Sequence, residues 1–148
     1  MKLVDEGVEA CRRGDWQAGL GHLAAVTRTE DLPVELPARF YSYLGHAMAR
    51  VQGRRKEGLS LCQHAIRLEF YRGENYYNLA QVYLLGGHRA AAVKAIHQGL
   101  ARDRKNRSLV LLARELGVRR SPVLPFLSRN NRINVLLGRL RHRLFSPP

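Results

Sequence analysis

The chain is poor in the residues that metal sites, disulfides and membrane insertion require. It contains two cysteines, Cys11 and Cys62, whose spacing fits neither a metal site nor a CxxC motif. We therefore expect free thiols and no metal. No run of about 18 apolar residues could form a membrane-spanning helix, and the N-terminus lacks the apolar core of a signal peptide. We expect a cytoplasmic protein, provided that the native chain starts at Met1.

Acidic residues are scarce in one part of the chain only. Residues 1–101 hold 13 Lys or Arg against 10 Asp or Glu, whereas residues 102–148 hold 12 against 2. The formal net charge of +13 is therefore +3 for the first part and +10 for the second. Such asymmetry indicates an anionic partner, which could be nucleic acid, an acidic lipid surface or an acidic protein.

Signatures of catalysis are absent as well. The sequence has no G-x-S-x-G elbow, no Walker loop and no H-E-x-x-H, and its six histidines are scattered. The segment Gly19–Ala24 reads G-x-G-x-x-A, but it falls inside a predicted helix and not at the turn after a strand, where that motif binds a dinucleotide. We expect a protein that is not an enzyme and that has no cofactor.

What the sequence does contain is one helix-turn-helix pattern, repeated three times. The repeats align on Gly14, Gly53 and Gly87, at spacings of 39 and 34 residues. A small residue follows each glycine at the fifth position, and an apolar residue follows at the ninth. These residues are Gly19, Gly58 and Ala92 in the first set, and Leu23, Cys62 and Ile96 in the second. A fixed period of small and apolar residues indicates stacked helix pairs that bury one another's apolar faces.

The third repeat shows the pattern without interruption. Tyr76, Leu79, Ala80 and Tyr83 form one apolar stripe at i, i+3, i+4 and i+7, and Gly86-Gly87 ends that helix. A second stripe follows, made of Ala92, Ile96, Gly99 and Leu100. The repeat resembles the tetratricopeptide repeat (TPR), with Tyr76 in the place of the family's Trp and Ile96 in the place of its Phe. Arg104 stands where the family usually has proline.

This resemblance implies an all-α, right-handed superhelical solenoid of antiparallel helix pairs. We place the repeats at about 1–31, 37–71 and 73–106, with a capping helix at 106–118. Compared with the third repeat, the second has one extra residue in the interval from Gly45 to Gly53. This predicts either a longer first helix in the second repeat or a bulged turn. Two prolines, Pro33 and Pro37, break the helix between the first two repeats.

In TPR arrays the first helix of each pair lines a concave groove in which peptides bind. The resemblance therefore implies a non-enzymatic adaptor or scaffold whose partner is another protein, bound through a peptide segment or a helix. The predicted contact residues are Arg39, Tyr43, His46, Arg50, Tyr77, Asn78 and Gln81. Packing between helices is the alternative role for Tyr43, Tyr77 and Asn78.

Residues 119–148 do not follow the repeat. A proline-bearing linker leads to a predicted basic amphipathic helix, whose apolar stripe is Ile133, Leu136, Leu137, Leu140 and Leu144. This helix could pack on the repeats, dock a partner or a second copy as a homodimer, or bind an acidic membrane or nucleic acid. The last alternative would use Arg119, Arg120, Arg129, Arg132, Arg139, Arg141 and Arg143.

Overall fold

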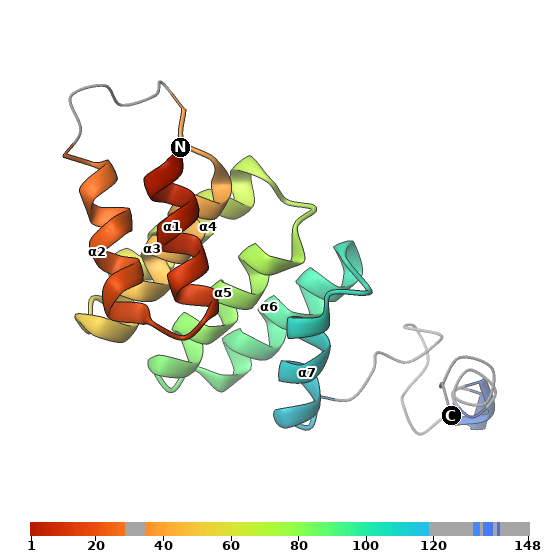
Figure 1. Cartoon of the computed structure of the whole chain (residues 1–148). Coiled ribbons are helices and arrows are strands. Elements are labelled where there is room, and N and C mark those ends of the chain that lie inside the picture. Colours follow the sequence, from red (N-terminus) through yellow and green to blue (C-terminus); the bar gives the residue numbers. More distant parts are fainter. Residues whose placement is uncertain (29–34, 119–131, 134, 138, 140–148) are drawn as a thin grey trace. The chain divides into compact units, whose positions relative to one another are not determined.

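The computed structural model describes residues 1–28, 35–118, 132–133, 135–137 and 139, and no strand occurs among them. The chain divides into two compact units, residues 1–117 and 118–148. The described residues of the first unit form seven helices, arranged as three pairs and a final single helix (Figure 1). They are α1 (Lys2–Arg12), α2 (Trp16–Val26), α3 (Ala38–Val51), α4 (Arg55–Leu68), α5 (Gly73–Leu85), α6 (Arg89–Arg102) and α7 (Arg107–Glu115).

The three aligned glycines form the turn inside each helix pair. Gly14, Gly53 and Gly87 have φ values of 88°, 68° and 75°. This left-handed conformation is open to glycine because it has no Cβ. In each pair the second helix begins two residues after the glycine, at Trp16, Arg55 or Arg89. The alignment made from the sequence therefore marks the same structural position in all three repeats.

Small residues let the two helices of a pair come close together. A Cβ placed on Gly58 in α4 would lie 2.4 Å from the carbonyl oxygen of Gly45 in α3. In the first pair, a Cβ on Gly19 would lie 2.3 Å from Cys11 Sγ. The extra residue of the second repeat lengthens its first helix, because α3 has 14 residues and α5 has 13.

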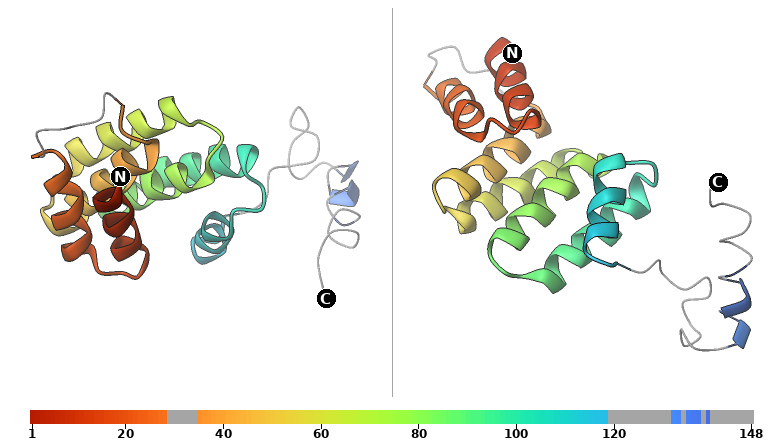
Figure 2. Two further views of the ribbon diagram at one scale, coloured as in Figure 1. Left: turned by 45° about the horizontal axis from the view of Figure 1, so that its top comes forward. Right: turned by 60° about the horizontal axis from the view of Figure 1, so that its bottom comes forward.

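The pairs stack one after another, from α1–α2 to α5–α6 (Figure 2). The first helices contact each other, α1 with α3 and α3 with α5, and each second helix contacts the first helix of the next pair.

Apolar side chains between these layers form the core, in which both cysteines are buried as free thiols. Burial raises the pKa of Cys11 to about 11, with a smaller effect of the Asp15 charge, and that of Cys62 to about 12. Both therefore stay protonated thiols.

The capping helix α7 packs on α5 and α6 and buries Leu109 and Leu112. Asn106 caps its N-terminus, where the side-chain oxygen accepts a hydrogen bond from the Leu109 backbone N–H at 3.1 Å. The helix is shorter than the predicted 106–118. It ends at Glu115 because Gly117 adopts a left-handed conformation with φ of 61°.

In the second unit, residues 132–133, 135–137 and 139 are helical, and all of them belong to the predicted basic helix. Ile133, Val135 and Leu136 are each more than 40% exposed. The rest of that helix and the linker at 119–131 lie outside the described residues. Within the part of the chain that the structure describes, no helix is long and apolar enough to cross a membrane.

Candidate functional site on the first helices of the repeats

The predicted contact residues lie on α3 and α5, which together with α1 are the first helices of the three pairs. We call the surface of these helices that carries the predicted residues the α1–α3–α5 face. Polar side chains on this face connect one repeat to the next. Their contacts decide which of the predicted residues a partner could reach.

An ion pair connects the first repeat to the third. Arg12 of α1 donates from Nη2 to both carboxylate oxygens of Glu74 at the start of α5, at 2.8 and 3.1 Å. Tyr43 of α3 lies between the two, because its hydroxyl donates to Glu74 Oε1 at 2.5 Å and accepts from Arg12 Nε at 3.2 Å. One contact set thus joins all three helices of the face.

Tyr43 is fixed in this position and has little free surface. Its side chain is buried, with 5% of the residue exposed. Burial, and after it the negative charge of Glu74, raises the pKa of the Tyr43 hydroxyl well above its ordinary value. The hydroxyl therefore remains protonated and serves as the hydrogen-bond donor to Glu74.

A second, fully buried set of polar contacts connects α3 to α5. The Asn78 side chain donates from Nδ2 to Ser42 Oγ at 2.9 Å, and its Oδ1 lies 3.0 Å from His46 Nδ1. Because Oδ1 only accepts in this orientation, the proton of the imidazole is on Nδ1. His46 Nε2 is buried, and no described residue gives it a hydrogen-bond partner.

His46 is neutral at physiological pH. Burial lowers its pKa to about 4; the hydrogen bond to Asn78 opposes this shift, and the charge of Arg50 adds to it. On its other side the imidazole contacts Trp16 of α2, with ring centroids 4.1 Å apart. Arg50 in turn lies over the Trp16 ring, 5.3 Å from its centroid. Arg50, Trp16 and His46 therefore form a stack in which only the arginine is largely exposed.

The seven predicted contact residues fall into two groups. Tyr43, His46 and Asn78 are buried and hold the helices together, which is the alternative role given above for Tyr43 and Asn78. The other four present surface on the face: Arg39, Arg50, Tyr77 and Gln81.

Three of those four residues make polar contacts within the protein. Arg39 makes an ion pair with Asp5 of α1 at 2.7 Å. Gln81 donates from Nε2 to the Tyr77 hydroxyl at 3.0 Å, and both residues are partly exposed.

The pairing of Arg12 with Glu74 is not among the contacts predicted from the sequence. These residues are 62 positions apart, so no local spacing rule relates them. Their opposite charges on the first helices of the first and third repeats were the available signal. Among the described residues no cluster of three potential metal ligands occurs, and Gly19–Ala24 lies within α2, where it cannot form a dinucleotide-binding turn.

Comparison with known proteins supports the repeat architecture. No protein-family model and no curated protein sequence matches the chain. Among solved structures, the chain is similar to MamA, a TPR-containing protein, with a TM-score of 0.54 and 22% sequence identity. The match covers 79% of this chain and 68% of MamA. The chain therefore has a TPR-like helical repeat fold.

Proposed function

We propose that this protein is a non-enzymatic adaptor that binds a segment of a partner protein on the α1–α3–α5 face. The observation that supports this most directly is the contrast within that face. The face has a buried set of polar contacts and, beside it, side chains that are at least partly exposed and suited to peptide recognition, namely Arg39, Arg50, Tyr77 and Gln81. Guanidinium groups bind carboxylates, and a tyrosine ring offers contact area at low entropic cost.

The buried contacts would supply preorganisation. Arg12, Tyr43 and Glu74 join the three first helices, and His46 with Asn78 joins two of them. A partner would thus meet a surface whose shape is already set, which lowers the entropy lost on binding. We place the partner on these four accessible residues and assign Tyr43, His46 and Asn78 to the support of that surface.

The first experiment is a pull-down from nuclease-treated lysate at 150 mM salt with the full chain, residues 1–117, and a Tyr77→Ala variant. Tyr71→Ala is the matched control, because Tyr71 is the same residue type, is 56% exposed and lies outside α3 and α5. We expect the first two baits to retain a discrete partner and Tyr77→Ala to lose it. Equal capture by Tyr77→Ala and wild type would contradict the proposal.

A second candidate function is the binding of an anionic surface through residues 119–148. This segment holds seven arginines and no acidic residue, and Arg132 and Arg139 are exposed. Phosphate contacts would make such binding fall by orders of magnitude between roughly 50 and 200 mM salt. Binding to duplex DNA or to phosphatidylserine vesicles that is lost in residues 1–117 and is steeply salt-dependent would favour this function.

A further inference from the structure

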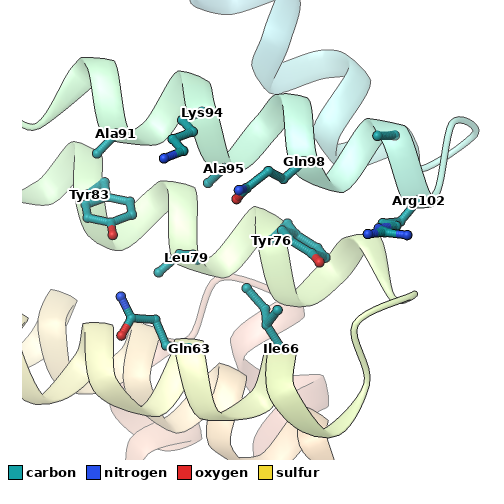
Figure 3. Close-up of a pocket in the computed structure, with 11 residues that line it drawn as sticks. Gln63, Ile66, Tyr76, Leu79, Tyr83, Ala91, Lys94, Ala95, Gln98 and Arg102 are labelled. Carbon is teal, nitrogen blue, oxygen red and sulfur yellow. The ribbon is translucent and has the colours of Figure 1, made fainter.

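A second surface of the repeats is hollowed, and none of the predicted contact residues lines it. It lies between α4 and α6, the second helices of the second and third pairs, and α5 forms its floor (Figure 3). We call it the α4–α6 groove; its volume is about 520 Å³. Tyr76, Leu79 and Tyr83 form the floor, whereas Tyr77 and Gln81 lie on other positions of α5 and do not line the groove.

The sequence explains why this groove is open. In the repeat alignment, Leu61 and His64 of α4 correspond to Ala95 and Gln98 of α6. At the junction of the first two pairs, Leu61 packs against the core and the His64 ring contacts Tyr41, with centroids 4.6 Å apart. At the next junction, Ala95 is smaller than the corresponding leucine, and Gln98 has no ring where the corresponding residue is histidine. The space that a leucine and an imidazole fill in one repeat is left accessible in the next.

The walls of the groove are polar and cationic. Figure 3 shows Gln63 and Ile66 projecting from α4 toward the side of α6 that carries Lys94 and Gln98. Arg102 stands at one end, with its guanidinium 5.4 Å from the ring centroid of Phe70. None of the described residues that line the groove is acidic. The groove therefore combines an apolar and aromatic floor with two positive charges.

The dimensions suit a short peptide segment. The lining residues of α6 run from Ala91 to Arg102, which corresponds to roughly 16 Å at the helical rise per residue. That length matches about three turns of a helix or about five residues of an extended strand. The chain's own residues 119–148 do not suit the groove, because they carry seven arginines and no acidic residue. They would place like charges beside Lys94 and Arg102.

We propose that the α4–α6 groove binds an acidic segment of a partner protein. Apolar side chains of the segment pack on Ile66 and the Tyr83 ring, which are partly exposed, and its carboxylates pair with Lys94 and Arg102. This site is separate from the α1–α3–α5 face and does not depend on that proposal. With both surfaces occupied, the protein connects two partners through α5, the helix that the two surfaces share.

The test is a selection of 12-residue peptides from a random phage-displayed library against the full chain, followed by fluorescence anisotropy with the selected peptides. We expect a class of peptides rich in Asp or Glu with two or more apolar residues. Ala91→Leu, which fills the groove, should abolish their binding. Ala90→Leu is the matched control, because it adds the same volume to the same helix at an exposed position outside the groove.

A charge-reversed variant makes the result independent of packing effects. Lys94→Glu with Arg102→Glu alters largely exposed residues and should weaken binding of the acidic peptides about tenfold or more, with an unchanged circular dichroism spectrum. Tyr77→Ala should leave this binding intact, which separates this site from the α1–α3–α5 face. Selection of no acidic class, or acidic peptides that bind both Ala91→Leu and the charge-reversed variant as tightly as wild type, would overturn the proposal.

Discussion

At the scale of single residues, burial changes the role of side chains that look like binding residues in the sequence. His46 is the clearest case. As an exposed histidine it would be a suitable ligand contact, but in the structure it is 1% exposed and lies between Trp16 and Asn78. Its position in the repeat was predictable, whereas its burial was not, because burial depends on how closely α3 approaches α5 and α2.

The burial of His46 predicts a specific dependence of stability on pH. Its pKa is about 4 in the folded protein and about 6.5 in an unfolded chain. Between these values the unfolded state binds more protons, so stability is fully present above pH 6.5 and falls as the pH is lowered toward 4. We expect this one residue to remove at most about 3 kcal/mol from the free energy of unfolding.

The measurement is urea unfolding of wild type and His46→Gln between pH 7.5 and 4. The variant lacks the titrating group, so the difference in unfolding free energy between the two proteins should shift in favour of the variant as the pH falls. A difference that stays constant across this range would show that His46 can be protonated in the folded protein without penalty.

At the scale of elements, the contact between paired helices depends on glycines that face a backbone. Gly58→Ala places a Cβ against the Gly45 carbonyl oxygen, which cannot rotate away as a side chain could. We expect a loss of about 1–3 kcal/mol in the free energy of unfolding, measured by urea denaturation.

Gly21→Ala is the control for that substitution. Gly21 lies within α2, and a Cβ there would meet nothing within 4 Å. Alanine has the higher helix propensity, so this change should stabilise the protein by up to about 1 kcal/mol. Equal effects of the two substitutions would mean that the α3–α4 crossing is looser than the structure shows.

The ion pair between Arg12 and Glu74 couples elements that belong to different repeats. Both side chains are partly exposed, at 48% and 28%, so water and salt screen their attraction. In a double-mutant cycle of Arg12→Gln and Glu74→Gln we expect a coupling energy of about 1 kcal/mol at low salt. The coupling should decrease at 1 M NaCl. No measurable coupling at low salt would show that the pair does not hold the first and third repeats together.

At the scale of the whole molecule, α7 closes the apolar end of the array. Leu109 packs where Gly99 leaves room beside Tyr76, and Leu109 and Leu112 are both buried. A chain that ends at residue 105 should therefore lose roughly 3–6 kcal/mol of stability from the exposure of these two side chains. A chain that ends at residue 117 retains them and should melt close to the full-length protein.

Thermal unfolding of these two truncated chains and the full chain, followed by circular dichroism at 222 nm, tests this expectation. If the chain ending at 117 melts far below full length, residues 118–148 stabilise the repeats, as one of the three alternatives for the tail requires. If the chain ending at 105 melts like the other two, α7 is not needed as a cap.

The sequence by itself determined the repeat, the turn glycines and the small residues that recur after them. Each of these depends on local rules of chain geometry, such as a left-handed turn or the spacing of one helix face. It also determined that the positive charge gathers in the last third of the chain. The repeat alignment also places Ala95 and Gln98 of the third repeat where the second has Leu61 and His64. That this difference opens a groove was not evident from the residues alone.

Only the tertiary structure decided which polar residues of the first helices are buried and which remain accessible. Arg12 meets Glu74, and His46 meets Asn78, because three helices from different repeats stack at close distance. The α4–α6 groove likewise exists because two second helices are held apart by α5. These features depend on distances between segments far apart in the sequence. Burial at these positions is set by how those segments pack, which no local sequence pattern encodes.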